Sequence, residues 1–314
     1  MNSLPQFNPG TFSSFLKRLL TAGFFTLSVA CLTVTAQSVT VVSWNVESGG
    51  SVDQTIRQRI ASFEGVDVWG LSEVASVASA GIFETGAEDG EEANFERIVG
   101  TTGGGDRLAI IFNADRFRLV RSQELLQINQ GNHRAPLVAE LQELSSNRNF
   151  LFMVNHLARG NAVLRRQQGT QLNEWVRTQT LPVIAVGDYN FDWEVVGGDQ
   201  DHDVGYDNMT NGGAWTWVRP ATLIKSQCSP NFNSVLDFIF VNAAAQTWSG
   251  TAEIIVVPND CDPSPLTSDH RPLLGTFNMG GDGGPRLTKE QLLRKIEEIE
   301  RQLIQLKDAV RRLP

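Results

Sequence analysis

Polar side chains stand at the ends of several apolar runs along this chain, where buried strands are expected. A carboxylate, amide or imidazole placed directly after an apolar strand is costly unless it is paired or solvated. Such groups can also hold a cation or transfer a proton, and strands hold them with the small positional error that catalysis requires. The residues are Asn45 and Glu47, Glu73, His156, Asp188 and Asn190, Asp237, and Asp269 and His270.

The elements that must position these residues are short, β-branched apolar runs that alternate with stretches of helical spacing. Two or more strands for each helix predict packed sheets covered by helices, in one domain of roughly 240 residues. We expect helices over 56–63 and 162–177, and a mobile, acidic and then Gly-rich surface loop over 84–105. Strands are expected over 38–44, 66–71, 108–112, 150–155, 183–186, 235–241 and 253–257.

Each of the polar residues also has an ordinary structural explanation when it is taken alone. The Gly-Asp-Tyr-Asn segment at 187–190 could form a turn, because Gly, Asp and Asn all favour turns. Glu73 could cap a helix, and His156 could be a hydrogen-bonded histidine of the core. The argument for a site therefore depends on the whole set and on its order along the chain.

Taken together and in this order, these residues resemble the motifs of the endonuclease/exonuclease/phosphatase superfamily, also called the deoxyribonuclease-I-like fold. The resemblance covers about 39–277 and is strongest in Gly-Asp-Tyr-Asn and in Ser-Asp-His-Arg-Pro at 268–272. It is weakest in the first motif, where Glu47 departs from the usual run. The resemblance implies an α/β (α+β) fold: a four-layered sandwich of two β-sheets flanked by helices, with the site where strand ends converge.

The resemblance also implies a metal site. Glu73 would be the main metal carboxylate, assisted by Asn45 and Asp269 directly or through water. All three offer oxygen ligands, which suit Mg²⁺ or Mn²⁺ better than Zn²⁺. Glu47 could add a further carboxylate or play no part.

The implied catalytic roles are those that hydrolysis of a phosphoester by water requires. Asp188 would orient or deprotonate the attacking water, and Asn190 would hydrogen-bond the phosphate. Asp237 would pair with His270 and fix its tautomer, leaving His270 either as the base or, protonated, as a ligand of phosphoryl oxygens. His156 would donate to the phosphate or to the leaving group.

Four further residues near these motifs are candidates for substrate binding. Arginine forks suit phosphate oxygens, although each of these residues could equally be an ordinary surface residue. Tyr189 and Trp193 also flank the site in sequence, and we expect them in the core rather than stacked on a substrate. The four candidates are Arg107, Arg134, Arg159 and Asn161.

The N-terminus is typical of an export signal. Lys17 and Arg18 precede an apolar run over 19–32, and small residues follow around Ala36. A basic region, a short apolar region and a small-residue end indicate a secretory signal over 1–36, cleaved near Ala36. An uncleaved anchor and a weak lipoprotein site at Cys31 are the alternatives. We expect a secreted or periplasmic protein without stable membrane insertion after cleavage.

Composition narrows the function classes. With 41% hydrophobic and 19% charged residues, the chain can bury a full core, which excludes a disordered or fibrous protein. The net charge of −9 argues against a high-affinity DNA-binding module, because neutralising phosphates needs Lys and Arg. Removal of the signal leaves Cys228 and Cys261, which an oxidising compartment would join as a disulfide unless they are separate buried thiols.

The C-terminal part differs in kind from the catalytic domain, which we place at 37–278. A Gly-rich linker over 279–286 precedes a helix over 287–314 with apolar residues at steps of 4 and 3. This heptad pattern predicts a coiled coil and a homo-oligomer formed through 292–313, or else an amphipathic helix docked on its own domain. The apolar positions are Leu292, Ile296, Ile299, Leu303, Leu306, Val310 and Leu313.

The sequence thus predicts an exported metal-dependent phosphodiesterase, with a nuclease acting on DNA or RNA as the first reading. A phosphatase or phosphodiesterase acting on small phosphorylated metabolites is the alternative within the same chemistry. The alternative from another class is an assembly protein that acts through its tail. The intact set of polar strand-end residues argues against that last reading, because a scaffold needs none of them.

Overall fold

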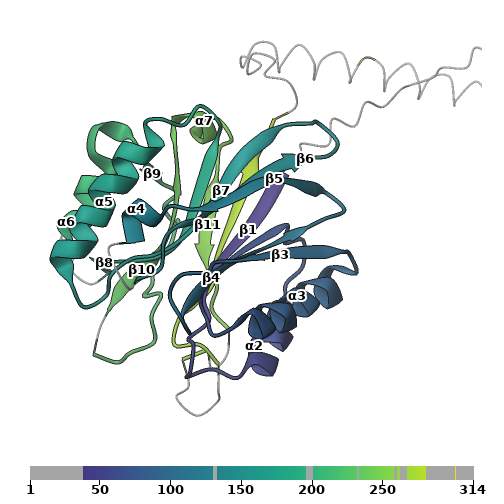
Figure 1. Ribbon diagram of the computed structural model, residues 1–314, viewed down its shortest axis with the longest axis horizontal. Helices are drawn as coiled ribbons and strands as arrows, with labels where there is room; N and C mark the ends of the chain where they lie inside the picture. The colour runs from purple at the N-terminus through teal and green to yellow at the C-terminus, as the bar shows by residue number, and fades with distance from the viewer. Residues whose placement is uncertain are drawn as a thin grey trace, which may run out of the picture. The chain divides into compact units, whose positions relative to one another are not determined.

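The chain folds around two mixed six-stranded β-sheets packed face to face, in a computed structural model (Figure 1). The structure describes residues 38–129, 133–195, 201–231, 233–257, 260–261, 267–280 and 301. The predicted signal over 1–36, most of the linker and the heptad helix lie outside the described residues. Among the described residues, no helix has the length and apolar character needed to cross a membrane.

The first sheet brings together strands from both ends of the domain. β1 pairs in parallel with β2 and antiparallel with β12, the last strand of the domain, so the sequence termini of the domain meet in one sheet. In spatial order the sheet contains β11 (Thr251–Ile254), β12 (Leu273–Asn278), β1 (Ser38–Asn45), β2 (Val68–Val74), β4 (Arg107–Asn113) and β3 (Phe95–Val99).

The second sheet is formed by the middle of the chain. Its only parallel pair among the described strands is β7 with β8, joined by a helical crossover. In spatial order it contains β5 (Phe117–Glu124), β6 (Leu137–Glu143), β7 (Asn149–His156), β8 (Val183–Glu194), β10 (Ser234–Val241) and β9 (Thr216–Trp217).

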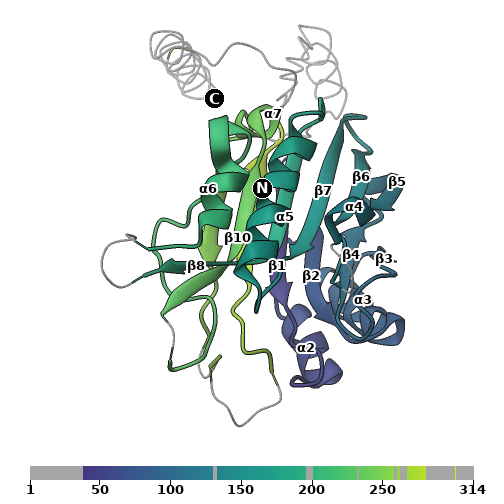
Figure 2. The ribbon, with the colours of Figure 1, turned by 60° about the vertical axis from the view of Figure 1, so that its left-hand side comes forward.

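Helices cover the two outer faces, which completes the four layers (Figures 1 and 2). α2 (Asp53–Ile60) and α3 (Val77–Glu91) cover the first sheet, where Trp69, Ile56 and Phe83 share one apolar cluster. On the other side lie α5 (Ala162–Val176) and α6 (Val204–Thr210), with the short α4 (Leu126–Asn129) and α7 (Ala243–Gln246). The predicted four-layered sandwich is therefore confirmed.

The main core lies between the sheets, and it requires close approach at one glycine. Gly70 of β2 faces the second sheet, and a Cβ placed there would lie 2.4 Å from Cγ2 of Val186. Tyr189 and Trp193 of β8 are buried in this core, as expected. Tight packing of the two sheets holds their strand ends at fixed positions relative to one another.

The predicted loop over 84–105 is wrong, because these residues belong largely to α3 and β3. The prediction gave more weight to the acidic and glycine residues than to the helical spacing of the apolar ones. Ala80, Phe83 and Ala87 follow one another at steps of three and four, and all three are buried. The Gly-Asp-Tyr-Asn segment is likewise not a separate turn but part of β8, which extends to Glu194.

Candidate active site

Strand register brings the polar strand-end residues together. In the first sheet Asn45 of β1 lies beside Ser72 of β2, so Glu73 follows at the same edge. In the second sheet His156 of β7 lies beside Asp188 of β8, and Asp237 of the antiparallel β10 lies on the other side of Asp188. These side chains meet because the parallel pairs end at the same edge of their sheets.

Asp237 and His270 form a buried pair. Nδ1 of His270 lies 2.7 Å from Oδ2 of Asp237, which is fully buried. The Ser226 hydroxyl donates to the same carboxylate over 2.7 Å, because its oxygen already accepts the backbone N–H groups of Leu236 and Asp237. A carboxylate that accepts both bonds stays ionised and holds the proton of His270 on Nδ1.

The His270 ring is held in its charged form by the carboxylates around it. Its Nε2 lies 3.9 Å from Oδ2 of Asp188 and 3.8 Å from Oδ1 of Asp269. Burial lowers the pKa of His270, but the charge and hydrogen bond of Asp237 and the charges of Asp188 and Asp269 outweigh it and raise this pKa to about 10. Burial also raises the pKa of Asp237, and we place the shared proton on the ring because Ser226 donates to the carboxylate.

Asn45 links two carboxylates across the sheets. Its Nδ2 donates to Oε1 of Glu73 over 2.9 Å and to Oδ2 of Asp188 over 3.2 Å. Its Oδ1 accepts the backbone N–H of Glu47 over 3.0 Å. Asn45 therefore presents donors to the site, and the predicted role as an oxygen ligand requires its amide group to turn over.

Asp188 and Asn190 lie in a strained part of β8. The preceding Gly187 has a φ of 140°, and a Cβ there would lie 2.0 Å from the carbonyl oxygen of Asn155. Asn190 has a φ of 52°, and its backbone N–H donates to Oδ1 of Asp188 over 3.0 Å. Such backbone geometry concentrates at functional sites, where the surrounding structure enforces it.

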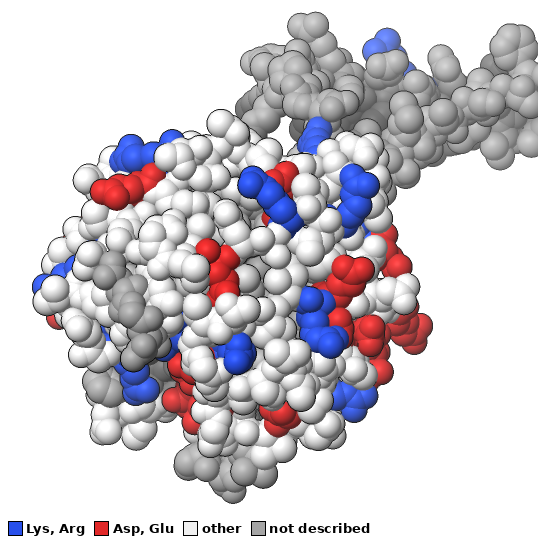
Figure 3. Space-filling view, in the orientation of Figure 1, with Lys and Arg blue, Asp and Glu red and all other residues white. Residues whose placement is uncertain are grey.

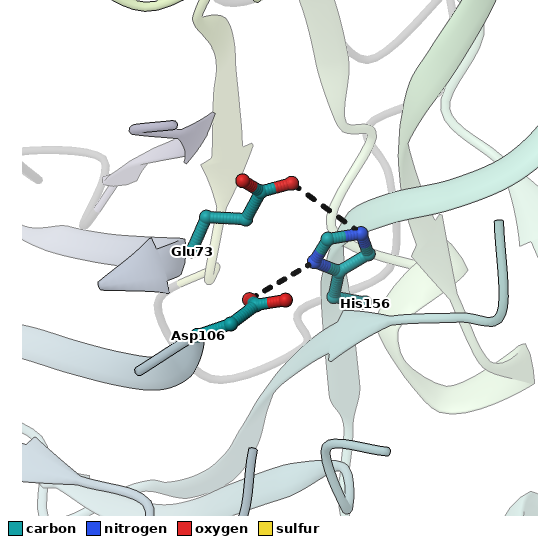
Figure 4. A group of neighbouring side chains, drawn as sticks. All are labelled: Glu73, Asp106 and His156. Atoms are coloured by element: carbon teal, nitrogen blue, oxygen red, sulfur yellow. Dashed lines mark ion pairs between the residues drawn. The ribbon is translucent and has the colours of Figure 1, made fainter. Parts of the chain in front are cut away.

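The His156 ring lies between the carboxylates of Glu73 and Asp106 (Figure 4). Its Nε2 is 3.8 Å from Oε1 of Glu73 and 3.4 Å from Oδ2 of Asp188. Its Nδ1 is 3.6 Å from Oδ1 of Asp106, whose other oxygen lies 3.0 Å from Nη1 of Arg134. Burial would raise the pKa of Asp106, but the neighbouring His156 ring and the charge of Arg134 lower it.

Asp106 is a site residue that the sequence analysis missed. The analysis looked for polar residues after strands, whereas Asp106 precedes β4. Because β4 runs antiparallel to β2, with Arg107 beside Val74, the start of β4 lies next to the end of β2. An acidic residue immediately before an apolar strand was the available signal.

Glu47 reaches into the site from the loop after β1. Its Oε2 accepts the backbone N–H of Asp269 over 2.8 Å, and its φ is 54°. Burial, together with the nearby charges of Asp269 and Glu73, raises the pKa of the Glu47 carboxyl group. Carboxylates that repel one another at close range are stabilised by a cation.

About half of the predicted residues line one hollow of about 490 Å³, whereas Asn45, His156 and Asp237 are not part of its lining. Its donor set fits a hard divalent cation, because carboxylate oxygens from Glu47, Glu73 and Asp269 converge there. Two groups also hold ligand atoms within 4.8 Å of one another, namely Glu73 with Asp106 and His156, and Asp188 with Asp237 and His270. The lining includes Glu47, Ser48, Glu73, Arg159, Asp188, Asn190, Gln227, Ser229, Asp269 and His270.

The four candidates for substrate binding separate into different positions. Arg159 lines the hollow, and Arg134 reaches the site through Asp106. Arg107 instead donates to the carbonyl oxygen of Gly100, and Asn161 caps α5 by accepting the N–H of Leu164. Arg159 is therefore the candidate best placed to meet a substrate.

A disulfide joins Cys228 to Cys261 beside the site. The backbone N–H of Cys228 donates to the carbonyl oxygen of Asp269, and Gln227 forms a β-bridge with His270. The disulfide therefore anchors the segment that contains Ser226, whose hydroxyl donates to the Asp237 carboxylate.

Comparisons with known proteins agree with this geometry. The profile of the endonuclease/exonuclease/phosphatase family matches residues 42–270. No curated protein matches the chain. Among solved structures, D. rerio TDP2 complexed with single-strand DNA product is 18% identical, with a TM-score of 0.61 over 77% of this chain and 100% of that chain.

Two bacterial structures are similar to the same extent. An endonuclease/exonuclease/phosphatase protein from Bacteroides vulgatus is 15% identical, with a TM-score of 0.60 over 77% of this chain and 99% of that chain. The mannosyl-6-phosphatase of Bacteroides thetaiotaomicron is 19% identical, with a TM-score of 0.56 over 76% and 98%. At these identities the likeness shows the fold, and the substrates differ among the neighbours.

Proposed function

The chain belongs to the endonuclease/exonuclease/phosphatase family, and from that premise we propose that it is a divalent-metal-dependent phosphodiesterase whose substrate is nucleic acid. Members of this family are phosphoester hydrolases that depend on a divalent metal. The observation that carries the proposal is the arrangement of His270, Asp237 and Asp188, which places a buried histidine–carboxylate pair beside a second carboxylate in a hollow.

Glu73 would hold the metal, with Asp269 and Glu47 beside it and Asn45 after rotation of its amide group. A bound divalent cation would neutralise the charge of the phosphate and help the leaving oxygen to depart. Mg²⁺ and Mn²⁺ both suit these oxygen ligands. The hydrogen bond from Asn45 to Glu73 would keep the carboxylate oriented in the absence of the metal.

Asp188 would take the proton of the attacking water. Its Oδ1 accepts the backbone N–H of Asn190, which orients the carboxylate whichever way the Asn45 amide is turned. His270, protonated and surrounded by carboxylates, would donate from Nε2 to a phosphoryl oxygen rather than act as the base. His156 would donate from Nε2 to the leaving oxygen, held in place by Asp106.

Nucleic acid as the substrate is supported by the D. rerio neighbour, which was complexed with single-strand DNA product. One observation favours small phosphoesters as the second candidate: the hollow is rich in acidic residues. Of the arginines that line it, Arg165 already donates to Asp203, which leaves Arg159. On the face shown in Figure 3, the Lys and Arg residues that the structure describes form no continuous basic track, and several lie beside acidic residues.

The decisive experiment is hydrolysis by residues 37–314 with Mg²⁺ or Mn²⁺, and with chelator. Plasmid DNA, bis-p-nitrophenyl phosphate and p-nitrophenyl phosphate would be compared, with His270→Ala as the test variant. His202→Ala is the matched control, because His202 stacks on Trp193 and is outside the hollow lining. Metal-dependent cutting of plasmid and diester, lost only in His270→Ala, is the expected result.

Activity on the monoester alone would contradict the proposed phosphodiesterase and indicate a phosphatase. Polymeric and small substrates also differ in their salt dependence, because binding of a polyanion releases counterions. Cleavage of nucleic acid should therefore weaken steeply between low and high salt, whereas hydrolysis of the small diester should change only mildly.

We also propose that the protein is exported and cleaved near Ala36, on the strength of the basic and apolar N-terminal pattern. N-terminal sequencing of the protein from culture medium or periplasm tests this proposal. An intact N-terminus on protein from a membrane fraction would contradict cleavage and favour the uncleaved anchor.

A further inference from the structure

A second hollow, of about 430 Å³, adjoins the first one. The two share Ser48 and Glu73 in their linings, so Glu73 stands at their border. The first hollow is lined mainly by charged and amide side chains. The second has five apolar side chains in its lining, Val46, Val52, Ala75, Ile82 and Phe83, beside the polar Ser48, Ser51, Asp53, Gln54 and Glu73.

Val52 keeps this hollow apolar at a position where a polar residue would stabilise the fold. It is the N-cap residue of α2, with the extended backbone of that position (φ −106°, ψ 122°), and the residue is 39% exposed. Ser, Thr, Asp and Asn are preferred there, because their side chains accept a hydrogen bond from the first turn. A valine side chain cannot accept that bond.

Ala75 adds a second small apolar surface to the lining of this hollow. It is exposed and comes two residues after Glu73, directly before Ser76, which caps α3. Two helix starts therefore open toward the same hollow, each with an apolar side chain at its edge. The surface is contiguous with a site built for a phosphate group, because Glu73 belongs to both linings.

We propose that this second hollow binds an apolar, ring-bearing substituent on one ester oxygen of the substrate, while the phosphate lies in the first hollow. The inference rests on the proposed function and makes it more specific. A ring that packs on Val52, Ala75 and Ile82 loses part of its contact with water, which increases its affinity. A bare phosphate or a methyl ester has no ring to bury and does not gain this affinity. The enzyme would thus select phosphoesters of aromatic or other ring-bearing groups.

Calorimetric titration with two phosphonates tests this in the full chain with Mg²⁺ present. Benzylphosphonate carries a ring and methylphosphonate does not, and neither has an ester bond that can be hydrolysed. The expected preference of the natural protein for benzylphosphonate is about tenfold, the gain from burying roughly half of a phenyl ring. Val52→Asn should abolish the preference and leave the affinity for methylphosphonate unchanged, and Val52→Leu should retain it.

Val52→Asn preserves the fold, because asparagine is among the best N-cap residues. Ala75→Asn gives an independent test at a second lining residue, with the same expected loss of preference. Equal affinities of the natural protein for the two phosphonates, or a preference that survives both asparagine variants, would overturn the inference while leaving the proposed function intact. Failure of both phosphonates to bind, together with absence of ester hydrolysis, would overturn the proposed function itself and this inference with it.

Discussion

Nδ1 of His270 lies 2.7 Å from Oδ2 of Asp237, although the two residues belong to segments of different sheets. Asp237 is inside β10 of the second sheet, and His270 precedes β12 of the first. The pair therefore exists only when the two sheets are packed together. Its strength depends on folding, and it in turn makes folding depend on pH.

The first prediction concerns stability between about pH 6.5 and 10. Burial lowers the pKa of His270, but Asp237, Asp188 and Asp269 raise it to about 10, above the ordinary 6.5 of the unfolded chain. A raised pKa stabilises the folded state fully below pH 6.5, and this stabilisation is lost as pH rises toward 10. With chelator present, the free energy of unfolding, measured by denaturant titration at each pH, should fall between pH 6.5 and 9.5.

The matched variant for that measurement is His270→Asn, which keeps a donor toward Asp237 but does not titrate. Its stability should fall less over the same interval. Identical pH profiles for the two proteins would contradict the assigned charge on His270.

The second prediction is that Glu73→Gln weakens Mg²⁺ binding at least tenfold in calorimetry, because the main carboxylate loses its charge. Glu47→Gln should weaken binding less, since Glu47 also accepts the N–H of Asp269. Glu253→Gln is the control, because Glu253 is exposed on β11. Absence of Mg²⁺ binding by the natural protein at millimolar concentration would favour the assembly-protein hypothesis.

The third prediction is that Asp106→Asn lowers kcat by about tenfold to hundredfold, the range for residues that orient a site histidine or ligand. The change leaves the shape of the side chain but removes the charge that faces Nδ1 of His156. KM and the melting temperature should change little, which separates positioning from general instability. Asp89→Asn, which breaks an exposed ion pair with Arg57, should leave kcat unchanged.

The fourth prediction concerns the disulfide. Replacing Cys228 and Cys261 by Ser should lower the free energy of unfolding by about 3.7 kcal/mol, the entropy of closing a loop between residues 33 apart in the sequence. Activity should also fall at temperatures where the variant is still folded. The reason is that Gln227 forms a β-bridge with His270 and Ser226 donates to Asp237. Full activity of the folded double variant would show that the site stands without the disulfide.

The fifth prediction is that truncation after Gly280 lowers the oligomeric mass in light scattering, because the heptad seam over 292–313 is removed. Turnover of bis-p-nitrophenyl phosphate should stay the same. A monomeric full-length chain would favour the alternative, in which the helix docks on its own domain.

Much of the candidate site could be predicted because its residues follow apolar strands whose patterns are strong. Asn45, Glu73, His156 and Asp188 each come at or beside the end of a predicted strand, and the structure places all four within one cluster. Asp106 was missed because it precedes a strand instead of following one, and only the antiparallel pairing of β4 with β2 brings it there.

Other features depended on which partner a side chain finds. Arg134 and Arg159 looked equivalent in the sequence, yet one pairs with Asp106 and the other lines the hollow. Asn45 was predicted as an oxygen ligand, yet it donates to two carboxylates. A residue type limits the bonds that a side chain can make, but neighbours from distant segments select among them.

The sequence by itself determined the family, the strand-end residues and the layered fold, because apolar periodicity and motif order are local properties of the chain. Only the tertiary structure decided that Asp237 and Ser226 hold one tautomer of His270, that Glu47 contacts Asp269, and that an apolar hollow borders Glu73. Each of those relationships joins segments that are distant in sequence. Their geometry is set by how the sheets pack and by strand register, which no local pattern records.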